Sequence, residues 1–297
     1  MKAHLYLYPD LQRRVAEGRH GFLCALVDVL KDNGFDVQMH GDTPEELDAG
    51  RARGGYSVVR MIDPLGPQGV TFRKTYYEPF YHLETTSARW TWPVAQTPFD
   101  PNQPAHKAAR FVANMRARIF GDRAISRDGF IFVPLQGRLL EKRSFQTMTP
   151  IEMLETLLEH DTRKIVATLH PRETYTAPEL TALEKLEVLN HRFFVTREPA
   201  EDLLASCDYV ATMNSSVALA GYFIEKPALL FGQVDFHHIA ARYADHGPDA
   251  IAKAPTLTPD YAAYLWWFFR VMAIRARGED AHQGVRAALK RAGWPIR

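Results

Sequence analysis

Short apolar runs alternate with amphipathic stretches along most of the chain, and this alternation predicts strands joined by helices. Near the N-terminus we expect strands at residues 4–8, 35–39 and 56–62. Residues 11–33 are helical in character and end at Asn33-Gly34. A second helix begins at Thr43, which is followed by proline and two glutamates. This part of the sequence therefore predicts a small α/β unit.

Residues 63–102 interrupt this alternation and show no clear period. They are rich in proline, glycine and aromatic residues, and a long irregular segment in a compact protein is commonly functional or a packing arm. One interpretation is acceptor recognition, because aromatic rings stack on sugar faces. The interpretation that we favour is that the rings bury an interface between domains or subunits.

From residue 130 the alternation becomes regular. Strands are predicted at residues 130–135, 164–169, 193–196, 209–213 and 228–231. Thr149 and Thr176 open helices with capping boxes, a short helix covers residues 199–206, and Asn214 is the predicted cap of the next helix. Five strands that alternate with helices imply a parallel sheet with right-handed crossovers. Two helices, at 258–277 and 279–292, complete the chain.

The predicted domain boundary lies in the polar, turn-rich segment 121–129. We expect an N-terminal α/β domain on the acceptor side, residues 1–125, and a nucleotide-sugar-binding domain with C-terminal helices, residues 126–297. The basic helix predicted at 104–120 is interpreted as a solvated face, with a surface for anionic lipid or polymer as the alternative.

Composition and charge narrow the functional classes. The formal net charge of +1 gives no general case for a nucleic-acid partner. Cys24 and Cys207 both lie in apolar contexts, which argues against a disulfide and for a reducing compartment. The apolar segment 262–276 is too short to span a bilayer and contains two arginines. We expect a cytoplasmic protein, with peripheral contact to the inner membrane or to export machinery as an open alternative.

Polar residues gather directly after the predicted strands of the second half. In an open parallel sheet, ligands bind at the carboxyl ends of the strands. The candidate phosphate-binding residues at these ends are Gln136, Arg138, His170, Arg172, Glu173, Asn214, Ser215 and Ser216. His170 is able to donate to a phosphate oxygen, and a helix that starts at a serine pair offers N–H groups to the same anion. An ordinary structural role for each residue is the alternative.

Four motifs in this half resemble the capsule polysaccharide biosynthesis proteins, which include the Kdo transferases of capsule and lipopolysaccharide assembly. They are Ile-Phe-Val-Pro-Leu-Gln at 131–136, Thr-Leu-His-Pro-Arg-Glu at 168–173, Thr-Met-Asn-Ser-Ser-Val-Ala-Leu at 212–219 and Lys-Pro-Ala-Leu-Leu-Phe-Gly at 226–232. The His-Pro pair and the serine pair are also similar to those of bacterial sialyltransferases. The resemblance covers about residues 130–238.

The resemblance implies a GT-B-like α/β fold, in which two Rossmann-like domains face a cleft and the N-terminal one is abbreviated here. It implies a CMP-activated donor such as CMP-Kdo, with His170 and Ser215–Ser216 near its phosphate. A glycan or glycolipid would be the acceptor. No metal or other cofactor is required if these groups neutralise the leaving charge.

The catalytic acid departs from the family pattern. The Kdo transferases carry an acidic residue in an Asp-rich stretch after the Gln strand, whereas this chain offers only Glu141 there. Asp128, followed by glycine, resembles the acidic motif of sialyltransferases and is the alternative base. Two other functions stay open: a non-catalytic sugar- or polymer-binding partner on the same fold, and an epimerase that acts on a UDP-sugar. A metal site at residues 235–238 is the less favoured interpretation of its two adjacent histidines.

Overall fold

The computed structural model describes residues 1–297, and the chain divides into two compact units. The first unit combines Met1–Thr97 with Phe268–Arg297, and the second unit is Pro98–Trp267. The division differs from the predicted boundary at residue 125 in two places. Helix α5 (Ala105–Phe120) packs against α12 (Tyr261–Trp266) in the second unit. The last thirty residues join the first unit, because α13 (Gly278–Arg291) packs on α2 (Gly21–Asp32).

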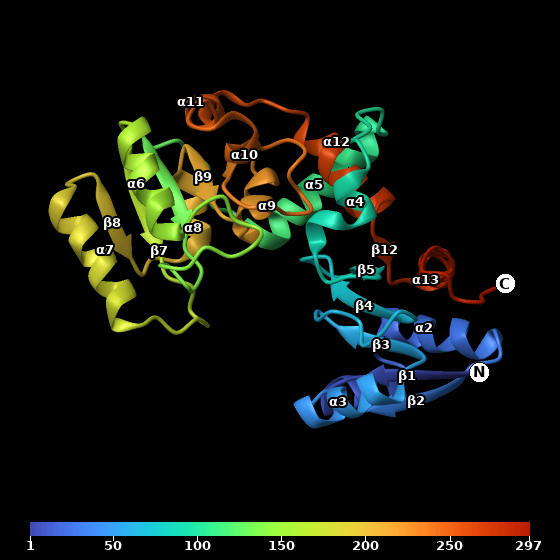
Figure 1. Cartoon of the computed structure of the whole chain (residues 1–297). Coiled ribbons are helices and arrows are strands. Elements are labelled where there is room, and N and C mark those ends of the chain that lie inside the picture. The colour runs from blue at the N-terminus through green and yellow to red at the C-terminus, as the bar shows by residue number, and fades with distance from the viewer. The chain divides into compact units, whose positions relative to one another are not determined.

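The first unit contains a six-stranded sheet in the order β12-β5-β4-β3-β1-β2 (Figure 1). Its strands are β1 (Lys2–Tyr6), β2 (Asp36–His40), β3 (Tyr56–Arg60), β4 (Gly69–Lys74), β5 (Phe80–Glu84) and β12 (Ile274–Arg275). The pairs from β2 to β4 are parallel, while β5 runs antiparallel to both of its neighbours. The predicted α/β unit is therefore present, with an antiparallel edge that the sequence did not reveal.

The predicted helix over residues 11–33 is two helices. Helix α1 (Pro9–Ala16) ends before Gly18, whose φ of +67° is a left-handed conformation that glycine adopts without steric cost. Helix α2 then begins after His20 and stops at Asn33, as predicted. The third helix, α3 (Pro44–Arg53), starts at the predicted cap Thr43.

The segment 63–102 is not irregular, which corrects the prediction. It holds β4, β5, a 3-10 turn (Arg89–Thr91) and α4 (Pro93–Gln96). Strand β5 is buried at all five positions, so no alternation marks it in the sequence. Two aromatic rings of the segment pack inside the first unit, where the ring centres of Phe80 and Tyr77 lie 5.2 Å and 6.1 Å from that of Phe269. Phe99 packs in the second unit, with its ring centre 5.2 Å from that of Tyr264.

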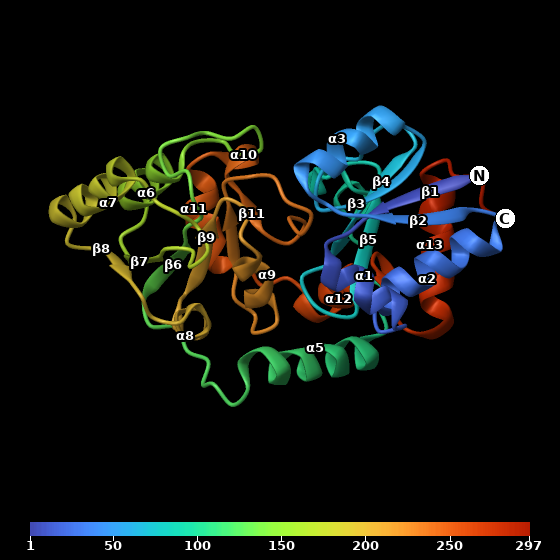
Figure 2. The same cartoon turned by 90° about the horizontal axis from the view of Figure 1, so that it is seen from below.

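The second unit is built on a parallel sheet in the order β11-β10-β9-β6-β7-β8 (Figure 2). Its strands are β6 (Phe130–Pro134), β7 (Lys164–Thr168), β8 (Phe193–Thr196), β9 (Tyr209–Thr212), β10 (Ala228–Leu230) and β11 (Ala241–Arg242). Counted from β6, the strands lie in the order 3-2-1-4-5-6, which is that of a dinucleotide-binding Rossmann sheet. The strand order reverses between β6 and β9, so a ligand site is expected at their carboxyl ends.

Helices cover both faces of this sheet. Helices α6 (Pro150–His160) and α7 (Ala177–Leu189) lie on one face, and α8 (Ala200–Ser206) and α9 (Ser216–Tyr222) lie on the other (Figure 2). Both predicted capping boxes form, since Thr149 and Thr176 each exchange two hydrogen bonds with the glutamate three residues on. The crossovers therefore hold the loops after β6 and β7 at one edge of the sheet.

The predicted helix over residues 258–277 is shorter than expected. Asp260, rather than Thr258, caps α12, and a π-helical turn (Trp267–Val271) follows it. The chain then forms β12, because Ile274 and Arg275 pair with β5. Two small helices precede this region, α10 (Tyr243–His246) and α11 (Asp249–Lys253). None of the helices combines the length and the apolar character that crossing a bilayer requires.

Candidate functional site

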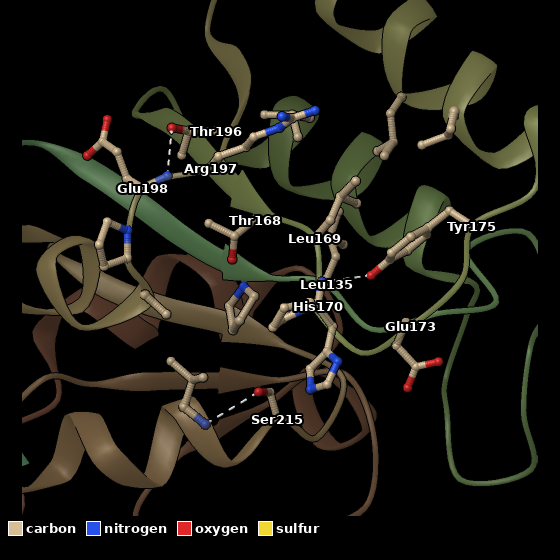
Figure 3. A pocket seen from close by; sticks show the side chains of 18 of the residues that line it. Leu135, Thr168, Leu169, His170, Glu173, Tyr175, Thr196, Arg197, Glu198 and Ser215 are labelled. Carbon is tan, nitrogen blue, oxygen red and sulfur yellow. Dashed lines mark hydrogen bonds between the residues drawn. The ribbon is translucent and has the colours of Figure 1, made fainter.

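A pocket of about 870 Å³ opens at the carboxyl ends of β6, β7 and β8 in the second unit. Its floor is formed by strand ends, and its walls come from the loop after β7, one side of α7, the start of α8 and the start of α9. His170 and Ser215 both line it, and Figure 3 shows the imidazole on the same side of the pocket as the Ser215 hydroxyl. The sequence predicted that these two residues lie near one another, and the fold brings them to one cavity.

The loop after β7 holds His170 in a defined orientation. Its backbone N–H donates to the Tyr175 hydroxyl at 2.8 Å, and its carbonyl accepts from the N–H of Glu173 at 3.1 Å. Its Nδ1 accepts the backbone N–H of Arg172 at 3.2 Å. The neutral ring must therefore carry its hydrogen on Nε2. That N–H is the group that His170 is able to offer to a ligand.

Tyr175 is part of this arrangement, although the sequence gave no signal for it. It lies in the pocket wall directly before the capping box of α7. Burial raises the pKa of its phenol, while the hydrogen bond from the His170 backbone acts in the opposite direction. The phenol therefore stays neutral, and it fixes the start of the His170 loop.

Ser215, rather than the predicted Asn214, is the N-cap of α9. Ser215 has the extended backbone of a cap (φ −66°, ψ 138°), and its Oγ accepts the N–H of Val217 at 3.3 Å. Its own N–H donates to Thr212 Oγ1 at 3.3 Å. Asn214 is buried one residue earlier, and neither it nor the exposed Ser216 lines the pocket.

Gly137, on the loop after β6, lies next to Glu173, which is on the loop after β7 and lines the pocket. A Cβ atom at Gly137 would lie 2.6 Å from the carboxylate oxygen Oε2 of Glu173, so a larger residue there would displace the Glu173 side chain. The loop is anchored by the buried Glu179, whose carboxylate accepts the N–H of Leu139 as well as two hydrogen bonds from Thr176. Burial acts to raise the pKa of Glu179, but these hydrogen bonds outweigh it and leave the pKa below its usual value.

The remaining predicted donor-binding residues lie around the pocket rather than in its lining. Gln136, Arg138 and Arg172 are absent from the lining, and Arg172 is exposed. The Oε1 atom of Gln136 is buried without a hydrogen-bond partner. The sequence placed these residues at the correct edge of the sheet, but it carried no information on which way each side chain points.

The two candidate catalytic acids are separated by the sheet. Glu141 lies on the loop after β6, with its side chain 66% exposed and 3.6 Å from Arg138. Asp128 precedes β6, and its N–H donates to the carbonyl of Ser206 at the amino edge. Five strand residues rise by about 17 Å, so Asp128 is a strand's length from His170. The structure does not bring Asp128 to the site.

The two adjacent histidines after β10 form hydrogen bonds with other residues of the second unit. His237 Nδ1 lies 2.8 Å from the carbonyl of Val234, and His238 Nδ1 lies 3.2 Å from the hydroxyl of Tyr264. Burial lowers the pKa of His237. Across residues 1–297, no three side chains of the kinds that ligate metals are grouped to hold an ion, and both cysteines are free.

Comparisons with known proteins identify the fold. Across 89% of both chains the structure is similar to KpsC, the β-Kdo 2,7 transferase of Thermosulfurimonas dismutans, with a TM-score of 0.53 and 13% sequence identity. The β-Kdo 2,4 transferase of the same organism's KpsC matches with a TM-score of 0.46 and 12% identity, over 85% of this chain and 89% of that chain. No protein-family model and no curated protein sequence matches the chain. At such low identity the similarity establishes the fold alone.

The protein therefore has a mixed α/β fold of the GT-B type, with two Rossmann-like units. Its fold is similar to that of the KpsC β-Kdo 2,7 transferase. The second unit carries the strand order of a Rossmann sheet, and its pocket opens at the carboxyl ends of three of the strands.

Proposed function

We propose that this protein is a glycosyltransferase of surface polysaccharide biosynthesis that transfers a sugar such as Kdo from a CMP-activated donor. One observation carries the proposal: His170 and Ser215 line a single pocket at the carboxyl edge of a Rossmann sheet, beside its topological switch point. The pocket volume of about 870 Å³ is sufficient for a nucleotide with its sugar.

In this proposal the donor phosphate lies between His170 and the start of α9. The Nε2–H of His170 donates to a phosphate oxygen, because Nδ1 is already engaged by the backbone of Arg172. The Ser215 hydroxyl accepts from Val217 and has its own hydrogen to donate. Arg172, exposed on the same loop, adds positive charge near the phosphate. These groups stabilise the charge that develops on the leaving CMP, so we propose no metal cofactor.

The transfer breaks the bond between the anomeric carbon and the phosphate oxygen, and CMP leaves with the electron pair. The oxygen of the acceptor hydroxyl forms the new bond to that carbon, and its proton passes to a carboxylate. Glu141 is our candidate for this base, or for a nucleophile that first forms a sugar ester. Glu173, which lines the pocket beside His170, is the alternative that the geometry adds.

The acceptor in this scheme is a glycan or glycolipid. We place the reaction in the cytoplasm, at the inner membrane face or beside export machinery, since surface polysaccharides are assembled there before export. This cellular placement follows from the proposed reaction and depends on it.

A second candidate function is a non-catalytic sugar-binding partner on the same fold. The observation that favours it is the position of Glu141, which is two-thirds exposed and adjacent to Arg138. A carboxylate so well solvated gains little of the electrostatic advantage of a closed active site.

Nucleotide titration tests the donor class. We expect CMP to bind and to raise the melting temperature, and UDP to do so much less. His170→Ala should weaken CMP binding about 10- to 100-fold, the weight of one hydrogen bond to a charged group. His191→Ala, an exposed histidine on the turn before β8, is the matched control and should leave CMP affinity unchanged. Preferential binding of UDP would instead favour the epimerase-type enzyme.

Release of CMP tests the reaction itself. Wild-type protein with CMP-Kdo and a glycan acceptor should release CMP, and Glu141→Gln should release it at least about 100-fold more slowly if Glu141 is the acid. Loss of activity in Glu173→Gln alone would assign the role to Glu173. A wild-type protein that binds CMP-Kdo but releases no CMP with any acceptor would support the binding partner.

A further inference from the structure

A second pocket, of about 360 Å³, lies in the first unit and shares no residue with the pocket that contains His170. It is bounded by β5, by the chain before and through β12, and by one side of α13. A Cβ atom at Gly284 would lie 2.8 Å from the Ile274 side chain, so α13 and β12 are in close contact beside it. All of its lining residues belong to the first unit, and this unit alone forms the cavity.

Five charged side chains line this second pocket. Arg270, Arg275 and Arg291 supply three positive charges, and Glu84 and Asp280 supply two negative charges. Positive charge is therefore in excess before any ligand binds. The side chains of Arg275 and Arg291 are 34% and 49% exposed, so the pocket is open to solvent where these two arginines line it.

The ion pairs in the pocket leave guanidinium N–H groups available. Arg275 Nη1 donates to Asp280 Oδ2 at 2.9 Å, and Arg291 Nη2 donates to the two carboxylate oxygens of Glu84 at 3.3 and 3.5 Å. Each of these arginines thus uses one side-chain nitrogen, and its other two nitrogens form no hydrogen bond within the protein. Because a guanidinium presents five N–H donors in a planar fork, both side chains are still able to bind an oxyanion.

Two of the arginines repel one another in the pocket. Burial is the main reason that the pKa of Arg270 lies below its usual value, and the charge of Arg275 lowers it further, while Asp280 acts in the opposite direction. The two guanidinium groups are therefore close enough to interact electrostatically. An anion bound beside both groups would offset this repulsion, which favours its binding.

Glu84 positions Arg291 at the pocket. The glutamate is 6% exposed, and the imidazole of His82, which is 3% exposed, lies beside it with Nδ1 3.4 Å from Oε1. Both residues are on β5, so the sheet fixes the carboxylate to which the last turn of α13 attaches its arginine. The guanidinium of Arg291 is thus held in place before a ligand arrives, which lowers the entropic cost of binding.

We propose that this second pocket binds the phosphate group of a small phosphate monoester, with Arg275 and Arg291 as its hydrogen-bond donors and Arg270 as a further source of positive charge. Near neutral pH a monoester carries nearly two negative charges and three terminal oxygens, which suit several guanidinium groups better than the two oxygens of a carboxylate. The volume of about 360 Å³ admits the phosphate together with a small organic group. This proposal is independent of the glycosyltransferase proposal, because the first unit alone forms the site.

Calorimetric titration with glycerol 1-phosphate tests the site. Arg275→Ala should weaken binding about 10-fold or more, as expected for loss of a hydrogen bond between charged groups. Arg286→Ala is the matched control, because Arg286 is also 34% exposed and also pairs with an aspartate, Asp32 at 3.1 Å, but lies outside the pocket. The control should leave the affinity unchanged. Equal losses in the two variants would overturn the proposal, since the general charge of the first unit would then explain binding.

The charge of the ligand is a second criterion. The methyl ester of glycerol 1-phosphate is a phosphodiester with one negative charge, and it should bind at least about 10-fold more weakly than the monoester. Equal affinity for the two compounds would contradict the monoester assignment. Arg291→Lys keeps a positive charge beside Glu84 but lacks the planar fork, so it should also weaken binding of the monoester.

Hydrogen–deuterium exchange of the wild-type protein locates the bound phosphate without relying on a variant. Glycerol 1-phosphate should slow exchange in α13 and in residues 270–275. Protection confined to the loop after β7 and the start of α9 would place the anion in the pocket of His170 and Ser215, and would overturn the proposal. The absence of any saturable binding by the wild-type protein would overturn it as well, whatever the outcome of the CMP titration.

The melting temperature shows whether Arg275→Ala acts through binding or through folding. The ion pair of Arg275 with Asp280 is partly exposed, so its loss should change the melting temperature of the ligand-free protein very little. Weaker binding at an unchanged melting temperature supports the proposal. A large fall in melting temperature, together with wild-type affinity in Arg291→Lys, would make the arginines structural and overturn it.

Discussion

In the first unit, the helix-capping hydrogen bond of His20 depends on the protonation state of its ring. It is the N-cap of α2, and its Nδ1 accepts the backbone N–H of Leu23 at 3.3 Å. Only the neutral ring has a lone pair for this hydrogen bond. Burial is the main reason that the pKa of His20 lies below its usual value of 6.5, and the charge of Arg14 adds to the effect.

This arrangement predicts acid sensitivity. As the pH falls below 6.5, the unfolded chain takes up a proton at His20 before the folded chain does, so the free energy of unfolding decreases. The stabilising contribution is complete above that pH and declines toward the lowered pKa. His20→Asn keeps a capping acceptor that does not titrate, so its free energy of unfolding should fall less between pH 7 and pH 5. Chemical denaturation at several pH values measures this, and parallel pH profiles for the two proteins would contradict it.

At the same scale, the candidate site was only partly predictable from the sequence. His170 and Ser215 were found because each follows a strand, and the ends of parallel strands must meet at one edge. The same rule argues against Asp128, since it precedes β6. Tyr175 gave no signal, because its role comes from partial burial and from the hydrogen bond that its hydroxyl accepts from the His170 backbone.

Among the elements, helices α6 and α7 of the second unit begin at residues whose side chains cap them. The side chains of Thr149 and Thr176 cap their helices as the sequence pattern predicts. Proline follows Thr149 directly and follows Thr176 after one residue. The predicted strands from β6 to β10 also agree with the structure to within about two residues, the usual uncertainty at element ends.

Capping gives a quantitative prediction at this scale. Thr149→Ala removes the hydroxyl that accepts the N–H of Glu152 at 3.2 Å, so it should lower the free energy of unfolding by about 1 kcal/mol. Thr149→Ser keeps the hydroxyl and is the matched control, with a change within about 0.5 kcal/mol. Urea denaturation measures both, and equal losses for the two variants would show that the methyl group of Thr149, rather than its cap, matters.

Strands β4 and β5 show where element prediction fails. Strand β5 is buried at all five positions and lacks the polar–apolar alternation of a half-exposed strand, whereas β4 alternates only from Val70 to Arg73. Their identity depends on the neighbours that cover them, which include β3 and the late strand β12. The sequence within a short window does not contain these neighbours.

For the whole molecule, the first unit is assembled from two ends of the chain. Trp294, only 4% exposed, lies 4.8 Å from Tyr56 and 5.6 Å from Phe35. The residues after α13 thus complete a core that the first strands begin.

Truncation of the Trp294 side chain tests whether the C-terminal residues are part of the first unit. Trp294→Ala should lower the stability of the first unit by about 3–5 kcal/mol, as for other large buried aromatic residues. Hydrogen–deuterium exchange should then accelerate in β1, β2 and β3 and stay unchanged in β6, β7 and β9. Trp294→Phe retains much of the apolar contact and should have a smaller effect. Faster exchange in the second unit alone would contradict the division that we describe.

By itself, the sequence determined the alternation of strands and helices, several of the helix caps and the edge of the sheet at which the pocket lies. These features depend on interactions between residues that are close along the chain, or on the direction of the strands. Only the tertiary structure decided which residues enter the pocket and which unit receives the C-terminal residues. Those outcomes depend on burial and on contacts between residues that are far apart in sequence, and the local pattern carries no record of them.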